Sequence, residues 1–142
     1  MSLYHCLLIG LQDLDLDTKQ KLTEEELLAE IQSALTKSDR AVFDQITLQP
    51  NDNKVTALME ARIDADGPSA LREEDFRWQL VYEEGVKSRD PFVREWFAYN
   101  LLLNNVLTAV ICRKHGFDVK KAIIGEGEVQ DMLRTSNARD FG

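Results

Sequence analysis

The chain has 142 residues and a formal net charge of −8, from 25 acidic and 17 basic side chains. A chain of this length buries roughly two thirds of its unfolded surface, which is enough for one domain with its own core. Residues 1–70 carry 13 acidic and 6 basic side chains, against 12 and 11 in residues 71–142, so the charge is concentrated in the first half. This balance argues against nucleic acid and anionic lipid as partners of that half.

The first apolar segment, Leu3–Leu11, fits either a helix or a short strand by periodicity, and we predict a helix. It lacks the basic start and the small-residue cleavage site of a signal peptide. The two cysteines, Cys6 and Cys112, stand in apolar surroundings without a paired spacing, which is typical of reduced, buried thiols. We therefore expect a cytoplasmic protein.

Two helices are predicted before residue 50. Thr23 and Glu26 have the spacing of a capping box. Apolar residues then recur at helical spacing: Leu27, Leu28, Ile31 and Leu35. Ser38 is expected to open a second, short helix with three buried positions: Val42, Phe43 and Ile46. A turn cluster at Pro50–Asn53 separates this helix from an amphipathic segment over residues 54–65.

The clearest break in the chain is Asp66-Gly67-Pro68. We predict that Ser69 caps the next helix and that this helix ends at Gly85. Its apolar positions are Leu71, Phe76, Trp78, Leu80, Val81 and Tyr82. The segment from Gly85 to Asp90 then turns the chain into the helix that follows.

Residues 90–116 predict one unusually long helix. Asp90 is a good N-cap, and a proline suits the first helical position. Arg113 and Lys114 complement the dipole at the C-terminal end, where Gly116 can adopt the left-handed conformation. At ~1.5 Å per residue the helix spans about 38 Å, the width of a small domain. We expect it to be the central helix of the fold.

This central helix is apolar on several sides. One stripe at helical spacing is expected to dock on the core: Phe92, Trp96, Tyr99, Leu103, Val106, Leu107 and Val110. Phe97, Leu101 and Leu102 point elsewhere, so the helix needs either a second layer of helices or a partner protein. The run from Leu101 to Cys112 is too short, and too interrupted by asparagine, to span a membrane.

Three asparagines lie among these apolar residues, and they predict specific hydrogen bonds. Asn100 and Asn104 are one turn apart on one flank, and Asn105 is on the far side. An amide buried among Leu and Val side chains costs about 1 kcal/mol or more unless it is hydrogen-bonded. We expect these side chains to fasten a neighbouring loop.

Beyond the central helix, short helices are predicted over Asp118–Ile124, before Gly125, and over Glu128–Arg134. No segment shows sustained alternation or a hairpin signal, so the expected fold is all-α. We predict a multi-helix bundle around the central helix at residues 91–115, forming one helical domain over residues 1–142. The polar segment Arg134–Gly142 completes no packed element, which indicates the N-terminal part of a larger helical protein.

No residue pattern predicts catalytic, cofactor-binding or metal-binding residues. Asp13, Asp15, Asp17 and Glu24 resemble a calcium loop but lack its glycine, and a second partial match has Arg62 in place of the first carboxylate. His5 and Cys6 are adjacent, and adjacent side chains do not face one another on a helix. His115 is interpreted as a cation near the helix C-terminus. The segment Gly125-Glu126-Gly127 carries an acid where a phosphate would sit.

A family resemblance involves both ends of the chain and is most specific in the second half. It is carried by the apolar start at Leu3–Leu11, by Arg94-Glu95-Trp96-Phe97 with Asn100, by Asn104-Asn105-Val106-Leu107-Thr108-Ala109, by Arg113-Lys114, by Ile123-Ile124-Gly125 and by residues 134–142. These segments resemble an uncharacterised bacterial family whose members are encoded inside V-type ATP synthase gene clusters. Members of that family continue past the last three residues of this chain.

A more distant similarity is to the all-helical central-stalk subunit of these enzymes, called C or d, which caps the membrane rotor ring. In that subunit an asparagine-containing helix ends in a basic pair, and a short helix ends in Ile-Gly or Leu-Gly. The comparable residues here are Asn105, Arg113, Lys114, Ile124 and Gly125. The resemblance implies a rotor-socket subunit.

The resulting expectation is a non-catalytic coupling or assembly subunit, cytoplasmic and peripheral to the inner membrane through the V-type ATP synthase, whose protein subunits are its partners. Direct membrane insertion, nucleic acid and a cofactor are not expected. Eight residues are expected to form an interface or a structural network: Arg94, Trp96, Phe97, Asn100, Leu101, Asn104, Asn105 and Arg113. Two alternatives stay open. One is a small helical enzyme or ligand-binding domain whose site is completed by a missing C-terminal part, and the other is a transient assembly factor.

Overall fold

The computed structural model describes residues 4 and 23–136, and within these residues every regular element is helical. The predicted all-α class is therefore confirmed. The chain forms two compact units, Met1–Asp44 and Gln45–Gly142. The predicted helix at Leu3–Leu11 lies outside the described residues, apart from Tyr4.

The first unit contains α2, Glu24–Ala34, and most of α3, Lys37–Ile46. The capping box at the start of α2 is confirmed: Glu26 N donates to Thr23 Oγ1 over 3.2 Å, and Thr23 N donates to Glu26 Oε2 over 2.8 Å. Helix α3 begins one residue before Ser38, because Thr36 Oγ1 accepts from Asp39 N and performs the capping. The positions predicted as buried on α3 are half-buried.

The second unit begins with α4, Asn53–Asp66, which ends at Gly67 with a φ of 83°. Helix α5 follows as Glu73–Val86. The prediction that Ser69 caps α5 is wrong. Its hydroxyl accepts from Leu71 N and forms a local turn, and the helix begins after Arg72. The buried side of α5 consists of Phe76, Leu80, Val81, Tyr82 and Gly85.

The long central helix is confirmed as α6, Pro91–His115. Asp90 Oδ1 accepts from Val93 N over 3.1 Å, and Gly116 takes the left-handed conformation with a φ of 72°. These local signals are sufficient to set both ends, because each satisfies backbone groups that a helix terminus leaves unpaired.

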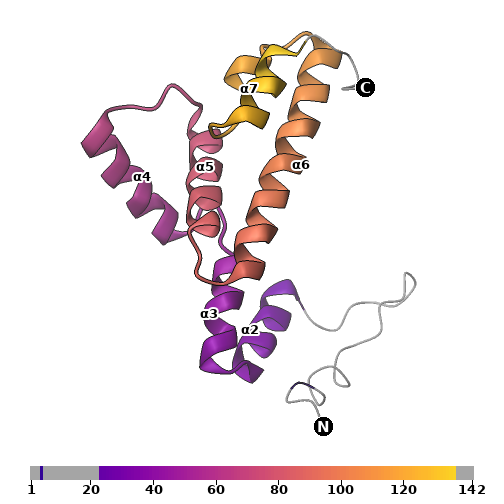
Figure 1. Cartoon of the computed structure of the whole chain (residues 1–142). Coiled ribbons are helices and arrows are strands. Elements are labelled where there is room, and N and C mark those ends of the chain that lie inside the picture. The colour runs from indigo at the N-terminus through magenta and orange to yellow at the C-terminus, as the bar shows by residue number, and fades with distance from the viewer. Residues whose placement is uncertain (1–3, 5–22, 137–142) are drawn as a thin grey trace. The chain divides into compact units, whose positions relative to one another are not determined.

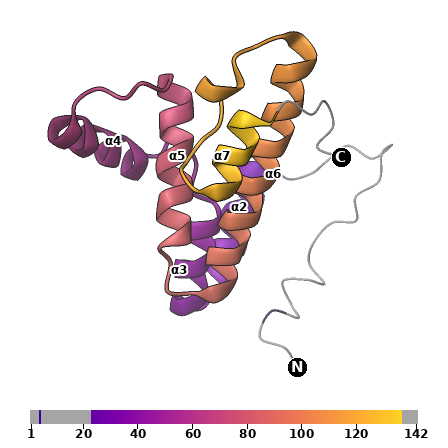
Figure 2. The same cartoon turned by 45° about the horizontal axis from the view of Figure 1, so that its top comes forward.

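The last elements in the described part of the chain are a 3₁₀ turn, η1, at Val119–Lys121, and α7 at Glu128–Thr135. The helix predicted over Asp118–Ile124 is thus reduced to one turn, while the helix predicted at Glu128 is confirmed. Helix α5 packs between α4 and α6, and η1 and α7 pack on α6 and on each other. This arrangement of the second unit is visible in both cartoon views (Figure 1 and Figure 2).

One core cluster joins α6 to the final elements. Ala109, Ile123 and Leu133 are at most 1% exposed, and Val106 and Val119 pack against them. The small Ala109 side chain lets η1 and α7 approach the helix closely. Full burial of each large aliphatic side chain contributes about 1.5–3 kcal/mol, so this cluster fastens α7 to α6.

Candidate protein-interaction surface

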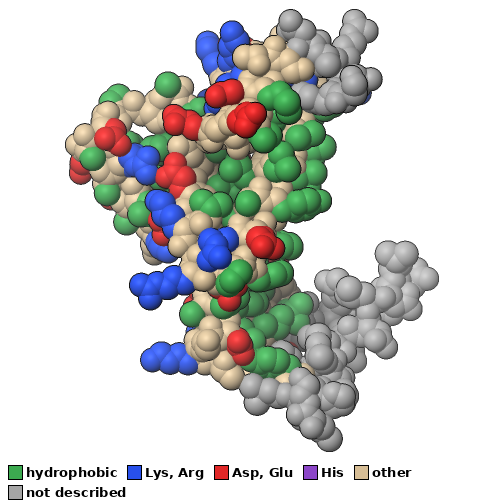
Figure 3. Space-filling model, in the orientation of Figure 1, with side chains coloured by type: hydrophobic (Ala, Val, Ile, Leu, Met, Phe, Trp, Pro, Cys, Tyr) green, Lys and Arg blue, Asp and Glu red, His purple; other side chains and the backbone are tan. Residues whose placement is uncertain are grey.

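Within the second unit, helix α6 has one face on which large apolar side chains remain exposed. Six large apolar side chains on this face are between 37% and 63% exposed, and we call them the α6 stripe: Phe92, Trp96, Tyr99, Leu103, Leu107 and Val110. Space-filling atoms show hydrophobic side chains gathered along α6 (Figure 3). At ~100° per residue these six positions fall within about 80° of the helix circumference, a straight band along the axis.

The stripe lies on the side of α6 opposite its buried residues. Those residues are Val93, Phe97, Asn105, Ala109 and Cys112. The sequence-based prediction that these six residues dock on the core is therefore wrong, whereas Val106, which was predicted with them, does pack against the core cluster at Ala109. The buried side has smaller and more polar residues, because close approach by η1 and α7 needs Ala109 and because Asn105 bonds to a loop.

Charge is absent along the stripe and present only at its ends. No Lys, Arg, Asp or Glu occurs from Trp96 to Cys112. Glu95 precedes this segment, and Arg113 and Lys114 follow it. Exposed Leu102 and Ile111 widen the apolar surface on either side. A continuous apolar band of this length is typical of a protein interface rather than of an ordinary solvated helix face.

The N-terminal end of the stripe is aromatic. The rings of Phe92 and Trp96 stack with centroids 6.2 Å apart and planes 29° from parallel, and both side chains are exposed. Tyr99, one turn further along, is 63% exposed. Large aromatic side chains of this kind often dominate binding energy when an interface covers them.

The eight residues predicted to form an interface or network separate into different environments. Trp96 is in the stripe, whereas Phe97 is buried against α5, with its ring 6.4 Å from that of Tyr82. Arg94 reinforces the turn before α6, because its Nη1 donates to the carbonyls of Ser88 and Arg89 over 3.0 and 2.9 Å. These contacts stabilise the corner between α5 and α6.

The three asparagines form different hydrogen bonds. Asn105 exchanges two hydrogen bonds with the backbone of Ile124, at 3.0 and 2.9 Å, which confirms the expectation that an asparagine fastens a loop. Asn104 Nδ2 donates to the Tyr82 hydroxyl and links α6 to α5. Asn100 Nδ2 donates to the carbonyl of Trp96 in its own helix over 2.7 Å, so it fastens no loop.

Two arginines anchor α7, and the sequence pointed to only one of them. Arg113 Nη2 donates to the carbonyls of Leu133, over 2.9 Å, and Ser136, over 2.6 Å. Arg134 Nη2 donates to the carbonyls of Ile123, over 3.1 Å, and Gly125. The anchoring role of Arg134 was missed. The signal for it is its position in the last turn of a short helix that directly follows the glycine-containing loop whose carbonyls it binds.

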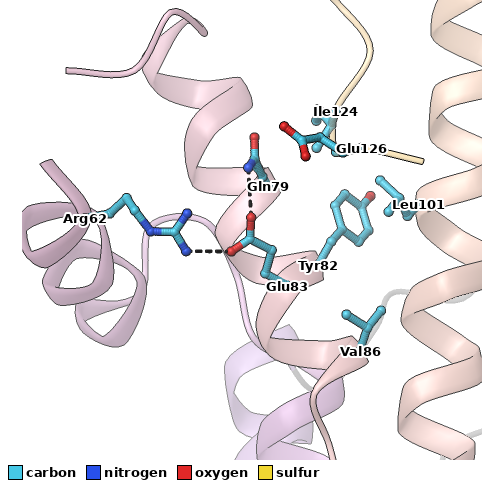
Figure 4. A pocket seen from close by; sticks show the side chains of 9 residues that line it. Arg62, Gln79, Tyr82, Glu83, Val86, Leu101, Ile124 and Glu126 are labelled. Carbon is cyan, nitrogen blue, oxygen red and sulfur yellow. Dashed lines mark hydrogen bonds and ion pairs between the residues drawn. The ribbon is translucent and has the colours of Figure 1, made fainter. Parts of the chain in front are cut away.

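A cavity of about 350 Å³ lies where α4, α5, α6 and the loop at Ile124–Glu126 meet. Figure 4 shows the side chains that line it, among them Leu101 from α6. Glu83 Oε2 accepts from Arg62 over 2.8 Å, and its Oε1 accepts from Gln79 over 2.8 Å. Three polar side chains of the cavity wall, Arg62, Gln79 and Glu83, are therefore joined by hydrogen bonds.

Two pKa values in this cavity wall are shifted. Burial acts to raise the pKa of Glu83, but the hydrogen bonds from Gln79 and Arg62 and the charge of Arg62 outweigh it, so that pKa is below its usual range. Burial raises the pKa of Tyr82, and the hydrogen bond with Asn104 offsets only part of that rise. The shift of Glu83 therefore comes from its pairing with Arg62 and Gln79, and the shift of Tyr82 comes from burial.

The other candidates from the sequence do not converge in the described part of the chain. Across residues 23–136, no three His, Cys, Asp or Glu side chains are close enough together to hold a metal ion. His115 stacks on Phe117 with ring centroids 6.0 Å apart. His5, Cys6 and the three aspartates of the first calcium-like segment lie outside the described residues. Within residues 23–136, no helix has the length and apolar character needed to cross a membrane.

Comparison with known proteins gives a family for the second unit. Residues 54–142, from the beginning of α4 onward, match the family described as protein of unknown function (DUF2764). The matched residues are more than half of the chain. The chain belongs to the DUF2764 family. No curated protein and no solved structure matches it. The DUF2764 match includes the whole α6 stripe, both asparagine links and both arginine anchors.

Proposed function

We propose that this DUF2764 protein is a non-catalytic structural, coupling or assembly subunit that works by packing its α6 stripe against another protein subunit. The observation that carries the proposal is the uncovered stripe itself: six large apolar side chains in one charge-free band on a well-capped helix. Covering such a band removes apolar area from water, which is the main favourable term in protein association.

The proposed assembly is a V-type ATP synthase, with the protein on its cytoplasmic side and peripheral to the membrane. Support comes from the sequence resemblance to proteins encoded inside V-type ATP synthase gene clusters, which includes Arg94 to Asn100 and Asn104 to Ala109. Both segments belong to α6. The more distant similarity to the C or d subunit points to the rotor socket as the place of attachment.

The test is affinity purification of the tagged protein, under gentle conditions, from cells that contain the associated V-type ATP synthase. We expect stalk subunits to be recovered in constant proportion to the tagged protein. Leu107→Glu places a charge in the stripe and should remove them, whereas Met132→Glu, an equivalent change at an exposed apolar residue of α7, should not. Recovery of no ATP synthase subunit with the wild-type protein would refute the proposal.

Stoichiometry distinguishes a stable subunit from an assembly factor. A structural or coupling subunit is recovered with the complete enzyme at a fixed ratio. A transient assembly factor is recovered with partial complexes and is absent from the finished enzyme. Mass spectrometry of the intact purified complex measures this difference directly.

A further inference from the structure

The six residues of the α6 stripe, taken together with Lys114 one turn beyond Val110, are spaced symmetrically about Leu103. From Phe92 to Lys114 these seven positions advance by four, three, four, four, three and four residues, with Leu103 in the middle: Phe92, Trp96, Tyr99, Leu103, Leu107, Val110 and Lys114. Two such helices placed side by side and antiparallel therefore bring each of these seven positions opposite another of the seven. A two-fold axis through Leu103 relates the two.

The side chains that this axis brings together are complementary in size. Trp96 faces Val110, and Tyr99 faces Leu107, so each large aromatic side chain lies opposite an aliphatic one. Leu103 faces its own copy. A parallel pair would instead place Trp96 on Trp96 and Tyr99 on Tyr99, which packs bulky rings together and leaves gaps between the smaller residues. Interdigitation of large and small side chains favours the antiparallel pair.

The charge of Lys114 also favours the antiparallel pair. Lys114 is exposed and continues the stripe by one turn, and in the antiparallel pair its ammonium group lies opposite the exposed ring of Phe92. A cation over an aromatic face is attracted by the ring quadrupole. In a parallel pair the two Lys114 side chains repel one another. A membrane surface is a poor occupant, because an interfacial helix carries Lys and Arg along its polar face. None occurs here from Trp96 to Cys112.

We propose that, in the free protein, the α6 stripe is covered by the stripe of a second copy in an antiparallel homodimer centred on Leu103. The proposal rests on the proposed function in one respect, because both take the stripe as a protein interface. A second copy would cover this interface before the protein joins the V-type ATP synthase. One helix against one helix is a small interface, below the standard class of about 1,200–2,000 Å². We therefore expect dissociation at roughly micromolar concentration.

The first experiment is sedimentation velocity of the whole chain over a dilution series through the micromolar range. The wild type and Met132→Glu should shift from dimer to monomer on dilution. Leu103→Glu and Leu103→Lys, which place like charges on the axis, should each stay monomeric at every concentration. An equimolar mixture of Leu103→Glu and Leu103→Lys should form a heterodimer, and this rescue cannot come from misfolding of either variant.

Disulfide trapping in a Cys6→Ser background tests the direction of the pair. Trp96→Cys mixed with Val110→Cys should cross-link rapidly, and each variant alone should not. Efficient cross-linking of Trp96→Cys alone indicates a parallel pair and overturns the proposal. A wild type that remains monomeric throughout the series also overturns it, including the case in which another segment of the same chain covers the stripe. A monomer that still recovers ATP synthase subunits refutes only the dimer, whereas a dimer that recovers none refutes only the ATP synthase proposal.

Discussion

Asn105 on α6 holds the backbone of Ile124 with both atoms of its amide. Its Oδ1 accepts from Ile124 N over 3.0 Å, and its Nδ2 donates to Ile124 O over 2.9 Å. Asn105 is 2% exposed, so both bonds lie where water cannot replace them. A single side chain therefore determines where the segment between α6 and α7 rests.

Replacing Asn105 with Ala should destabilise the second unit strongly. The substitution leaves the backbone N–H and C=O of Ile124 without partners, at a cost of about 1–3 kcal/mol for each unsatisfied group. Urea denaturation followed by circular dichroism measures the loss. The matched control is Asn100→Ala, which removes only a bond to the helix's own backbone and should change stability by less than about 0.5 kcal/mol. Equal losses in the two variants would contradict this account.

The sequence predicts best what depends on neighbouring residues. The capping box at Thr23, the ends of α6 at Asp90 and Gly116, and the break at Gly67 are all confirmed, because each arises from local hydrogen bonds or backbone preference. The helix predicted at Asp118 is instead a 3₁₀ turn, since only five residues separate its N-cap, Asp118, from Ile124, which Asn105 fastens. Here a tertiary contact determined the local structure.

The direction of α6 could not be predicted from hydrophobicity. Hydrophobicity predicts that the most apolar stripe, from Phe92 to Val110, faces the core, but only its member Val106 packs there, and the helix buries the side with Ala109 and Cys112. Hydrophobic periodicity shows that a face avoids water and does not show what covers it. The informative residues are Ala109 and Asn105. Close packing of α7 requires a small side chain at Ala109, and fastening of the loop requires the amide of Asn105.

Gly85→Ala should be destabilising, although alanine normally favours a helix. Gly85 is buried near the end of α5, and a methyl group there would overlap the ring of Phe97 on α6. Overpacking of this kind costs about 1–3 kcal/mol, which exceeds the gain of roughly 1 kcal/mol from helix propensity. Thermal unfolding should show a lowered Tm. The double variant with Phe97→Leu should lose less than the sum of the two single changes, and simple additivity would contradict the proposed contact.

Arg134→Lys should loosen α7 without affecting α5. Arg134 Nη2 donates to the carbonyls of Ile123 and Gly125 while its Nη1 donates to Asp131, and a lysine ammonium, with a single nitrogen, cannot make all of these contacts at once. We expect faster amide hydrogen exchange in residues 128–135 and unchanged exchange in α5. Asp131→Asn is the control, because the ion pair it removes is exposed at the carboxylate and contributes no more than about 0.5 kcal/mol. Exchange that accelerates equally in α5 would argue against a local anchor.

The ion pair between Arg62 and Glu83 should make stability depend on acid pH. The pKa of Glu83 is lower in the folded protein than in the unfolded chain, so its contribution is present above the unfolded value of about 4.3 and disappears as pH falls through the folded pKa. Glu83→Gln should therefore be less stable than the wild type at neutral pH, by less than about 1 kcal/mol because both partners are partly exposed. The two stability curves should converge in acid. A difference that persists at low pH would assign the effect to packing.

Stripe residues should contribute little to folding, in contrast to buried residues of similar size. Leu107 is 50% exposed and Ile123 is 1% exposed, so truncation to alanine removes very different amounts of packing. At concentrations that keep the protein monomeric, Leu107→Ala should change the free energy of unfolding by less than about 0.5 kcal/mol. Ile123→Ala should lower it by about 2–5 kcal/mol, since a cavity remains beside Ala109 and Leu133. Urea denaturation of both variants gives the comparison. A loss at Leu107 as large as that at Ile123 would mean that the stripe is already packed within the single chain, and it would then cease to be a candidate interface.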